Sequence, residues 1–337
     1  MKKSLLIGGL TAVLLAALLL FSACGNENEE FFTEGQYTYR LLDEGEYEIV
    51  SYNGDEKDLI LPARVRGAKV VSVGDRAFAD NKTIESVAIG DSFESIGKEA
   101  FLNCVSLEKV LLADTVQTVE SYAFASCFAL PSIQMPKDLS KLSEGVFKQC
   151  ISLSKVSLPE TLAYIGDFAF EGCASLVSFT LPSHTATLGN AFIGCVSLVH
   201  VSLNKELREI SAETFASCHS LESVSGGSNV TVIGRGAFRD CRSLAEYTMP
   251  QKLRIVDEEA FSGCTSLSSV KFYESVSANG QKTAAHVHQS AFEDCNALET
   301  VYYFYSGREE KSLLTVDEIG NEALLGAKTV FAYKEAK

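Results

Sequence analysis

The sequence has no tryptophan, three methionines and six prolines, and acidic residues outnumber basic ones. With 29 lysines and arginines against 44 aspartates and glutamates, the net charge is -15. Such a surface repels phosphate backbones, so we expect no nucleic-acid partner. No Cys-x-x-Cys pair supports a zinc site, and no glycine-rich loop stands between an expected strand and helix to hold a phosphate.

Histidine is also scarce, with five residues in the chain. His286 and His288 would lie on one face of a strand, which is half of a metal site, and Glu293 and Asp294 follow them in the sequence. Because no carboxylate stands at a convincing spacing, we expect solvated histidines, no metal and no cofactor. No nucleophile, histidine and acid form the pattern of a triad, so we expect no catalytic residues and no enzyme.

Residues 1–24 have the three-part pattern of an export signal. Lys2 and Lys3 precede an apolar run over 5–21, and small residues lead to Cys24. We expect residues 1–23 to be a signal peptide, with an uncleaved transmembrane helix as the alternative because the run is long enough to span a bilayer. Residues 24–36 begin with glycine, asparagine and glutamate, which predicts a flexible tether.

The segment Phe21-Ser22-Ala23-Cys24 resembles the lipobox of bacterial lipoproteins, although leucine is usual where Phe21 stands. The resemblance implies that Cys24 is lipidated and that the exported protein is held at the outer face of the cell membrane by its N-terminal lipid alone. Two or three acyl chains anchor a protein firmly, whereas one does not. A fully released protein is the remaining alternative.

Repetition is what the sequence has in abundance. The phrase Ala-Phe-x-x-Cys-x-Ser-Leu recurs, and its phenylalanines are separated by 23, 23, 23, 23, 22, 23, 23, 23 and 31 residues. A fixed period of this kind marks a solenoid, in which stacked units share one core. The phenylalanines are Phe78, Phe101, Phe124, Phe147, Phe170, Phe192, Phe215, Phe238, Phe261 and Phe292.

Each unit contains three kinds of local signal. Leu-x-x-Val-x-Leu alternates like a strand with one buried side, Ile-Gly marks a second inward contact before a turn, and Ala-Phe-x-x-Cys predicts a tight helical turn. We therefore predict a right-handed stack of β/3-10 coils with a parallel sheet. Burial of each phenylalanine or leucine contributes about 1.5–3 kcal/mol, which a single coil cannot obtain alone.

The solenoid is expected over residues 63–314, with about ten coils of 22–23 residues. An insertion near 273–288 accounts for the interval of 31. Residues 37–62 are expected to form an N-terminal β cap, a hairpin in which 47–52 pairs with 59–62 through Asn53-Gly54. Residues 315–337 are expected to form a capping coil in which leucine replaces the phenylalanine.

The repeat resembles the BspA-like leucine-rich repeats of bacterial surface proteins, whose units read much like Ile-Gly-x-x-Ala-Phe-x-x-Cys-x-Ser-Leu. The resemblance extends from about Val73 to Tyr303, and Asn81, Val146 and Thr214 depart from it. It implies adhesion to host proteins, other cells or extracellular matrix.

One slot of the repeat is occupied by cysteine in nine units. The shared slot and the odd number favour a column of buried free thiols, with scattered disulfides or a metal or redox role as alternatives. These cysteines are Cys104, Cys127, Cys150, Cys173, Cys195, Cys218, Cys241, Cys264 and Cys295.

The outward positions of Leu-x-x-Val-x-Leu form the best candidate for a binding face, because side chains there vary without disturbing the core. Few are aromatic, so a merely solvated face is the alternative. We single out Glu108, Lys109, Ser154, Lys155, Ser178, His200, Glu222, Glu246 and Tyr302.

The sequence thus predicts a surface-displayed, monomeric recognition or adhesion protein. Its expected partner is an extracellular protein or a cell-surface ligand, host or microbial. An envelope scaffold protein, or a lipoprotein that captures glycans or peptides, is the alternative. The expectation of adhesion rests on resemblance rather than on a recognisable site.

Overall fold

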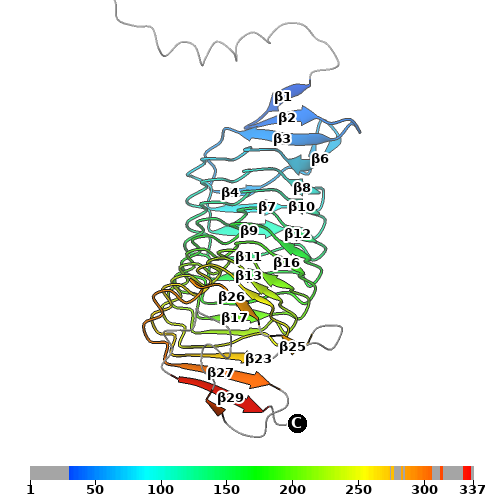
Figure 1. Ribbon diagram of the computed structural model, residues 1–337. Helices are drawn as coiled ribbons and strands as arrows, with labels where there is room; N and C mark the ends of the chain where they lie inside the picture. The colour runs from blue at the N-terminus through cyan, green and yellow to red at the C-terminus, as the bar shows by residue number, and fades with distance from the viewer. Residues whose placement is uncertain are drawn as a thin grey trace, which may run out of the picture.

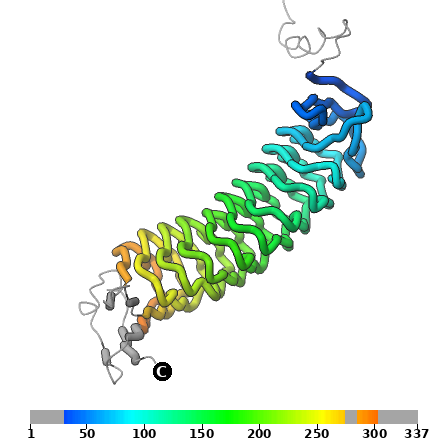
Figure 2. The backbone as a smooth tube through the Cα atoms, turned by 90° about the vertical axis from the view of Figure 1, so that its right-hand side faces the viewer, coloured from blue at the N-terminus to red at the C-terminus, as the bar shows by residue number. Residues whose placement is uncertain are grey.

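The computed structural model describes residues 30–273, 275–276, 282–283, 285–305, 312–313 and 329–334. The chain forms an elongated stack of coils, with the first strands at one end and the last strand at the other (Figures 1 and 2). We number the coils 1 to 10 by their phenylalanines, from Phe78 to Phe292. The predicted repeat solenoid with parallel sheets is confirmed.

Each repeat coil contributes one strand to each of two faces. The long-strand sheet consists of β4 (Asp58–Ile60), β7 (Ser86–Ile89), β9 (Lys109–Leu112), β11 (Ser132–Gln134), β13 (Lys155–Ser157), β15 (Ser178–Thr180), β17 (His200–Leu203), β19 (Ser223–Gly226), β21 (Glu246–Thr248), β23 (Ser269–Tyr273), β27 (Thr300–Tyr305) and β29 (Thr329–Lys334). The short-strand sheet consists of β3 (Tyr47–Tyr52), β6 (Ala68–Val73), β8 (Ser95–Ile96), β10 (Thr118–Val119), β12 (Lys141–Leu142), β14 (Tyr164–Ile165), β16 (Thr187–Leu188), β18 (Glu209–Ile210), β20 (Val232–Ile233), β22 (Ile255–Val256) and β26 (His286–Val287).

Neighbouring strands pair in parallel, with equivalent residues in register. Val201 of β17 lies opposite Val224 of β19. The long-strand ladder is interrupted between β9 and β11, between β13 and β15, and between β19 and β21, and the short-strand ladder between β10 and β12 and between β16 and β18. In most other coils the residue before the strand donates its N–H to the preceding coil, as Ser154 does to the carbonyl of Pro131. Between β9 and β11 this bond is missing because Pro131 has no N–H to give to Glu108.

The third side of each coil, which we call the turn wall, runs from two residues before the phenylalanine to two residues after it. In coil 2 the N–H groups of Glu99, Phe101 and Asn103 donate to carbonyls of coil 3 at 2.9, 2.8 and 2.9 Å. Glu99 and Asn103 have φ angles of 57° and 59°, in the left-handed region. All three donors therefore point toward the following coil. The tight helical turn expected here is replaced by this wall, and the described residues contain no helix.

The phenylalanines form one column of stacked rings through the core. Phe78 and Phe101 have ring centroids 4.8 Å apart, and the largest separation, 6.1 Å, lies between Phe124 and Phe147. The column continues without interruption to Phe292. Leucines and the inward residues of the short strands pack around it, so one apolar core runs the length of the stack, as predicted.

The nine repeat cysteines form a second buried column and are free thiols, as predicted. Each thiol donates a hydrogen bond to the carbonyl of the preceding coil's phenylalanine, as Cys127 does to Phe101 at 3.3 Å and Cys295 to Phe261 at 3.0 Å. Cysteine suits this slot because it is a small apolar side chain with one weak donor. In coil 1, Asn81 occupies the slot and accepts from the N–H of Ile84 instead.

The N-terminal cap differs from the predicted hairpin. β1 (Phe31–Glu34), β2 (Tyr37–Leu41) and β3 form an antiparallel meander, and β3 joins the short-strand sheet through β6. Residues 58–60, expected to pair with 47–52, instead begin the long-strand sheet as β4. β5 (Arg64–Val65) pairs with β6. Phe31–Glu34, expected to belong to the tether over 24–36, is instead a strand of the cap.

Two features lie near the C-terminal end. The insertion expected near 273–288 contains a small antiparallel pair, β24 (Ser275–Val276) with β25 (Lys282–Thr283). In the predicted capping coil, β29 pairs with β27 and with β28 (Ser312–Leu313). The expected signal peptide and the expected lipidation site, Cys24, lie outside the described residues. Among the residues that are described, no helix has the length and hydropathy to cross a bilayer.

Candidate functional site

The long-strand sheet presents its outward side chains as regular rows. The first row holds the first residue of each strand, and the second row holds the residue two positions later. A third, the approach row, holds the residue immediately before each strand. Because the backbone hydrogen bonds and the inward side chains hold the coils, these outward positions are not needed for packing.

All nine residues predicted for the binding face lie on these rows. The first row contains Lys109, Lys155, Ser178, His200 and Glu246, which begin β9, β13, β15, β17 and β21. The approach row contains Glu108, Ser154 and Glu222, and the second row contains Tyr302. From β9 to β27 there are eight strand steps, or on the order of 40 Å. The face therefore brings these side chains into line but does not gather them into one pocket.

Polar contacts hold the two ends of the face. Near the N-terminal end, Lys57 pairs with Glu85 at 2.5 Å. Toward the C-terminal end, Lys271 pairs with Glu246 at 2.9 Å. His200 Nδ1 lies 2.8 Å from the hydroxyl of Ser223 on the next strand.

The sequence-based choice missed the corner between the turn wall and the long-strand sheet. The residue immediately after each repeat cysteine stands there, and we call these positions the corner row. In coils 2 to 6 they are Val105, Phe128, Ile151, Ala174 and Val196. Phe128, Ile151 and Val196 are exposed. The signal was an apolar residue recurring after the cysteine, at a position that the repeat pattern leaves unconstrained.

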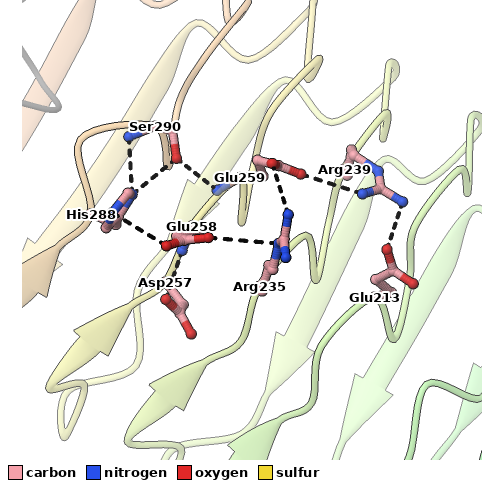
Figure 3. A network of polar contacts seen from close by, with 8 residues as sticks. All are labelled: Glu213, Arg235, Arg239, Asp257, Glu258, Glu259, His288 and Ser290. Atoms are coloured by element: carbon pink, nitrogen blue, oxygen red, sulfur yellow. Dashed lines mark hydrogen bonds and ion pairs between the residues drawn. The ribbon is translucent and has the colours of Figure 1, made fainter.

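A separate charged network crosses the turn wall of coils 7 to 10 (Figure 3). Arg239 bridges Glu213 at 2.8 Å and Glu259 at 3.4 Å, so it links three consecutive coils. Arg235 lies 3.3 Å from Glu259 and 3.7 Å from Glu258. The network thus reinforces the stack where the repeats approach the insertion.

The histidine pair considered from the sequence does not form a metal site in the described part of the chain. His288 Nε2 lies 3.7 Å from Glu258, and its Nδ1 lies 2.9 Å from the hydroxyl of Ser290 (Figure 3). His286 is exposed on β26. No three potential ligands among the described residues are grouped to hold an ion.

Replacing Arg239 with glutamine is expected to lower the unfolding free energy by less than about 1 kcal/mol, because the ion pairs are partly exposed and screened by water. The loss should shrink at high salt, where such pairs contribute least. Urea unfolding at low and high salt measures both effects. Arg242→Gln is the control, because Arg242 contacts Asp240 of its own coil. Equal losses in the two variants would show that the bridge between coils contributes nothing.

The chain is similar to a known protein family and to several solved structures. The profile of a family described as "BspA type Leucine rich repeat region" matches residues 71–198 and 189–309 with six copies. A search of curated proteins finds no match. Among solved structures, a leucine-rich cell surface protein from Faecalibacterium prausnitzii is 22% identical, with 92% of this chain and 96% of that chain covered and a TM-score of 0.50.

Two further solved structures are similar to this chain. A leucine-rich repeat protein of T. pallidum is 26% identical, over 62% of this chain and 88% of that chain, with a TM-score of 0.46. The pneumococcal vaccine antigen PcpA is 15% identical, over 91% and 99% of the two chains, with a TM-score of 0.45.

Proposed function

The chain belongs to the BspA-type leucine-rich repeat family, and we propose that it is a bacterial surface lipoprotein that recognises another protein through its long-strand face. The observation that supports the proposal is that, within each coil, one set of side chains packs the core and another set faces outward. Inward phenylalanine, leucine and cysteine side chains hold the stack, while the rows on the face point outward, where a partner can contact them. A rigid face of this length suits a large partner better than a small molecule.

The support from relatives concerns location more than ligand. The F. prausnitzii protein is described as a cell surface protein. Solenoids of this kind serve as binding scaffolds, and we propose no catalytic role. Adhesion to a host or microbial protein is the specific form of recognition that we propose.

A binding screen tests this function. The full-length chain, solubilised in detergent, is presented to matrix proteins, glycans and whole cells, and retained material is quantified. Saturable binding to a protein ligand is expected. Absence of binding to all three classes of target would contradict recognition. Binding confined to glycans would favour the capture alternative, and binding confined to proteins of the cell's own envelope would favour the scaffold alternative.

Anchoring is proposed to occur through a lipid on Cys24. Cys24→Ala is expected to abolish incorporation of labelled fatty acid and to leave the unprocessed precursor, because the modified thiol is lost. Metabolic labelling followed by gel electrophoresis measures this. Cys295→Ala, which removes a buried repeat thiol, should retain the label. Unchanged labelling of Cys24→Ala would refute the anchor.

A further inference from the structure

Charged side chains are nearly absent from the middle of the long-strand face. From β11 to β17, the three rows carry Lys155 and His200 as their titratable groups, in a chain that is 22% charged. Glu108 and Glu222 mark the two margins of this stretch. Its members are Pro131, Ser132, Gln134, Ser154, Lys155, Ser157, Val177, Ser178, Thr180, Val199, His200 and Ser202. Depletion of charge is typical of the core of a protein interface rather than of a solvated surface.

Exposed apolar side chains concentrate beside the same stretch. Nine large apolar residues are exposed in the described part of the chain, and five of them are Leu111, Phe128, Ile151, Val177 and Val196. All five belong to coils 2 to 6, on the face or on its corner row. Clusters of this kind, bordered by polar groups, mark contact surfaces.

The corner row changes character at the ends of this stretch. It is apolar from Val105 in coil 2 to Val196 in coil 6, but coil 1 has Lys82 and coils 7 and 8 have His219 and Arg242 at the equivalent position. Core packing does not require the apolar choice, since the other coils fold with polar residues there. Packing within the solenoid therefore does not explain why the corner row is apolar in coils 2 to 6.

The first row adds positive charge beside this apolar line. Lys109, Ser132, Lys155, Ser178 and His200 follow one another, so a basic residue alternates with a serine. Among the described residues, neither Lys109 nor Lys155 has an ion-pair partner, although the molecule carries a net charge of -15. Basic positions two coils apart are separated by about 10 Å.

We give the name central patch to the long-strand face from β9 to β17 together with the corner row from Val105 to Val196. We infer that the central patch binds a partner polypeptide segment that carries carboxylates beside aliphatic side chains. The carboxylates would meet Lys109 and Lys155, and the aliphatic groups would cover the corner row at Phe128 and Ile151. This inference rests on the proposed function and names the part of the face and the chemistry of its partner. Binding of such a segment to the central patch requires no movement of the coils.

Charge and apolar character together favour a polypeptide over other anionic partners. A polysaccharide offers hydroxyl groups, and burying them against aliphatic side chains would leave them without hydrogen-bond partners. An anionic membrane or a nucleic acid extends well beyond the central patch, so its charges would meet the acidic remainder of the chain, whereas a short segment with a few carboxylates would meet Lys109 and Lys155. A polypeptide segment with glutamate or aspartate among leucines meets both requirements in one ligand.

The test uses short synthetic peptides and the full-length chain. One labelled peptide combines glutamate, leucine and serine, a second replaces each glutamate with lysine, and a third replaces each leucine with serine. Fluorescence anisotropy is expected to show binding of the first peptide only, and to show that added salt weakens it. Absence of binding, or preference for the lysine or leucine-free peptide, would overturn the inference.

Matched variants locate the site. The double variant Lys109→Glu and Lys155→Glu is expected to raise the dissociation constant by about tenfold or more, because attraction becomes repulsion. The control, Lys141→Glu with Arg254→Glu, makes the same change in charge on the short-strand side and should alter binding less than about twofold. Equal loss in both would mean that only net charge matters, which contradicts the central patch.

A second matched pair tests the apolar line. Ile151 and Ile255 are exposed to similar extents, 43% and 39%, but only Ile151 lies in the central patch. Ile151→Ser should weaken binding of the first peptide several-fold, whereas Ile255→Ser should not. If a sulfated or uronate polysaccharide displaces that peptide and binds the Ile151→Ser variant unchanged, the polypeptide partner is wrong.

The inference and the broader proposal fail separately. A protein ligand found in the binding screen that still binds the Lys109→Glu and Lys155→Glu variant leaves surface recognition standing and removes the central patch from it. If the screen yields no ligand of any class, recognition itself fails.

Discussion

Raising the pH from about 8 to about 10 under reducing conditions is expected to unfold the coil stack, since buried thiols resist ionisation that the unfolded chain allows. The pKa of an unperturbed cysteine is 9.0, whereas burial raises the pKa of Cys104, Cys150 and Cys218 to about 12. Burial likewise raises the pKa of four more thiols, Cys127, Cys173, Cys195 and Cys241.

The sign of the effect follows from these directions. The folded-state pKa lies above the unfolded one, so the stability that depends on protonated thiols is complete below pH 9 and is lost as the pH rises toward the folded value. Each such thiol lowers the free energy of unfolding by about 1.4 kcal/mol per pH unit over that range. The three thiols with a pKa of about 12 together lower the free energy of unfolding by roughly 4 kcal/mol per unit, a large part of the stability of an ordinary domain, and the other four act in the same direction.

Circular dichroism during an alkaline titration measures the transition, with a phosphine reductant present to prevent disulfide formation. The variant Cys173→Ala is the control, because its transition should involve one proton fewer and be less steep. A stack that keeps its ellipticity well beyond pH 10 would contradict the linkage between burial and ionisation.

The second large effect concerns the ring column. Phe147→Ala is expected to lower the unfolding free energy by about 3–5 kcal/mol, because it leaves a cavity in the core. Phe147 is fully buried and stacks between Phe124 and Phe170 at 6.1 and 5.7 Å. Since each coil contacts only its neighbours, the cavity also weakens the coupling between the two halves of the stack.

Urea unfolding followed by circular dichroism is expected to show a lower midpoint and two separable transitions for Phe147→Ala. Phe128→Ala is the matched control, because Phe128 is the same residue type in the adjacent coil but is 40% exposed on the corner row. Its loss should stay near the level of ordinary surface substitutions, within about 0.5–1 kcal/mol. If both variants were destabilised equally, ring stacking would not be the source of stability.

The sequence was sufficient to predict the stack, its period and its core. The signals at Phe101, Cys104 and Leu107 are weak individually, but each recurs in nine or ten units, so the shared interior could be deduced without knowing any long-range contact. The outward placement of Lys109 and Lys155 followed from the same alternation. For a solenoid, the nearest neighbour in space is the next repeat in sequence.

Other elements could not be predicted because their determinants are not local. The strand at Ser95–Ile96 is too short for an alternating pattern, so the second sheet was not foreseen. Tyr122 and Phe168 adopt φ angles of 60° and 58°, although their residue types do not favour that region. For Tyr122, this conformation points the N–H to the carbonyl of Glu144 in the following coil, which accepts it at 2.8 Å. The partner of β4 was likewise chosen by register between coils rather than by the nearby Asn53-Gly54 turn.

The nearest-neighbour bonding of the turn wall also governs how the molecule responds to tension. A protein tethered at one end and gripped at the other carries load along its axis, and its terminal coil is bonded on one side only. Coils are therefore expected to unfold one at a time, beginning at the end of the stack. Each one frees about 23 residues, which extend to roughly 75–80 Å, while the folded body shortens by about 4.8 Å. Under shear, such a protein lengthens in steps and keeps its remaining coils folded.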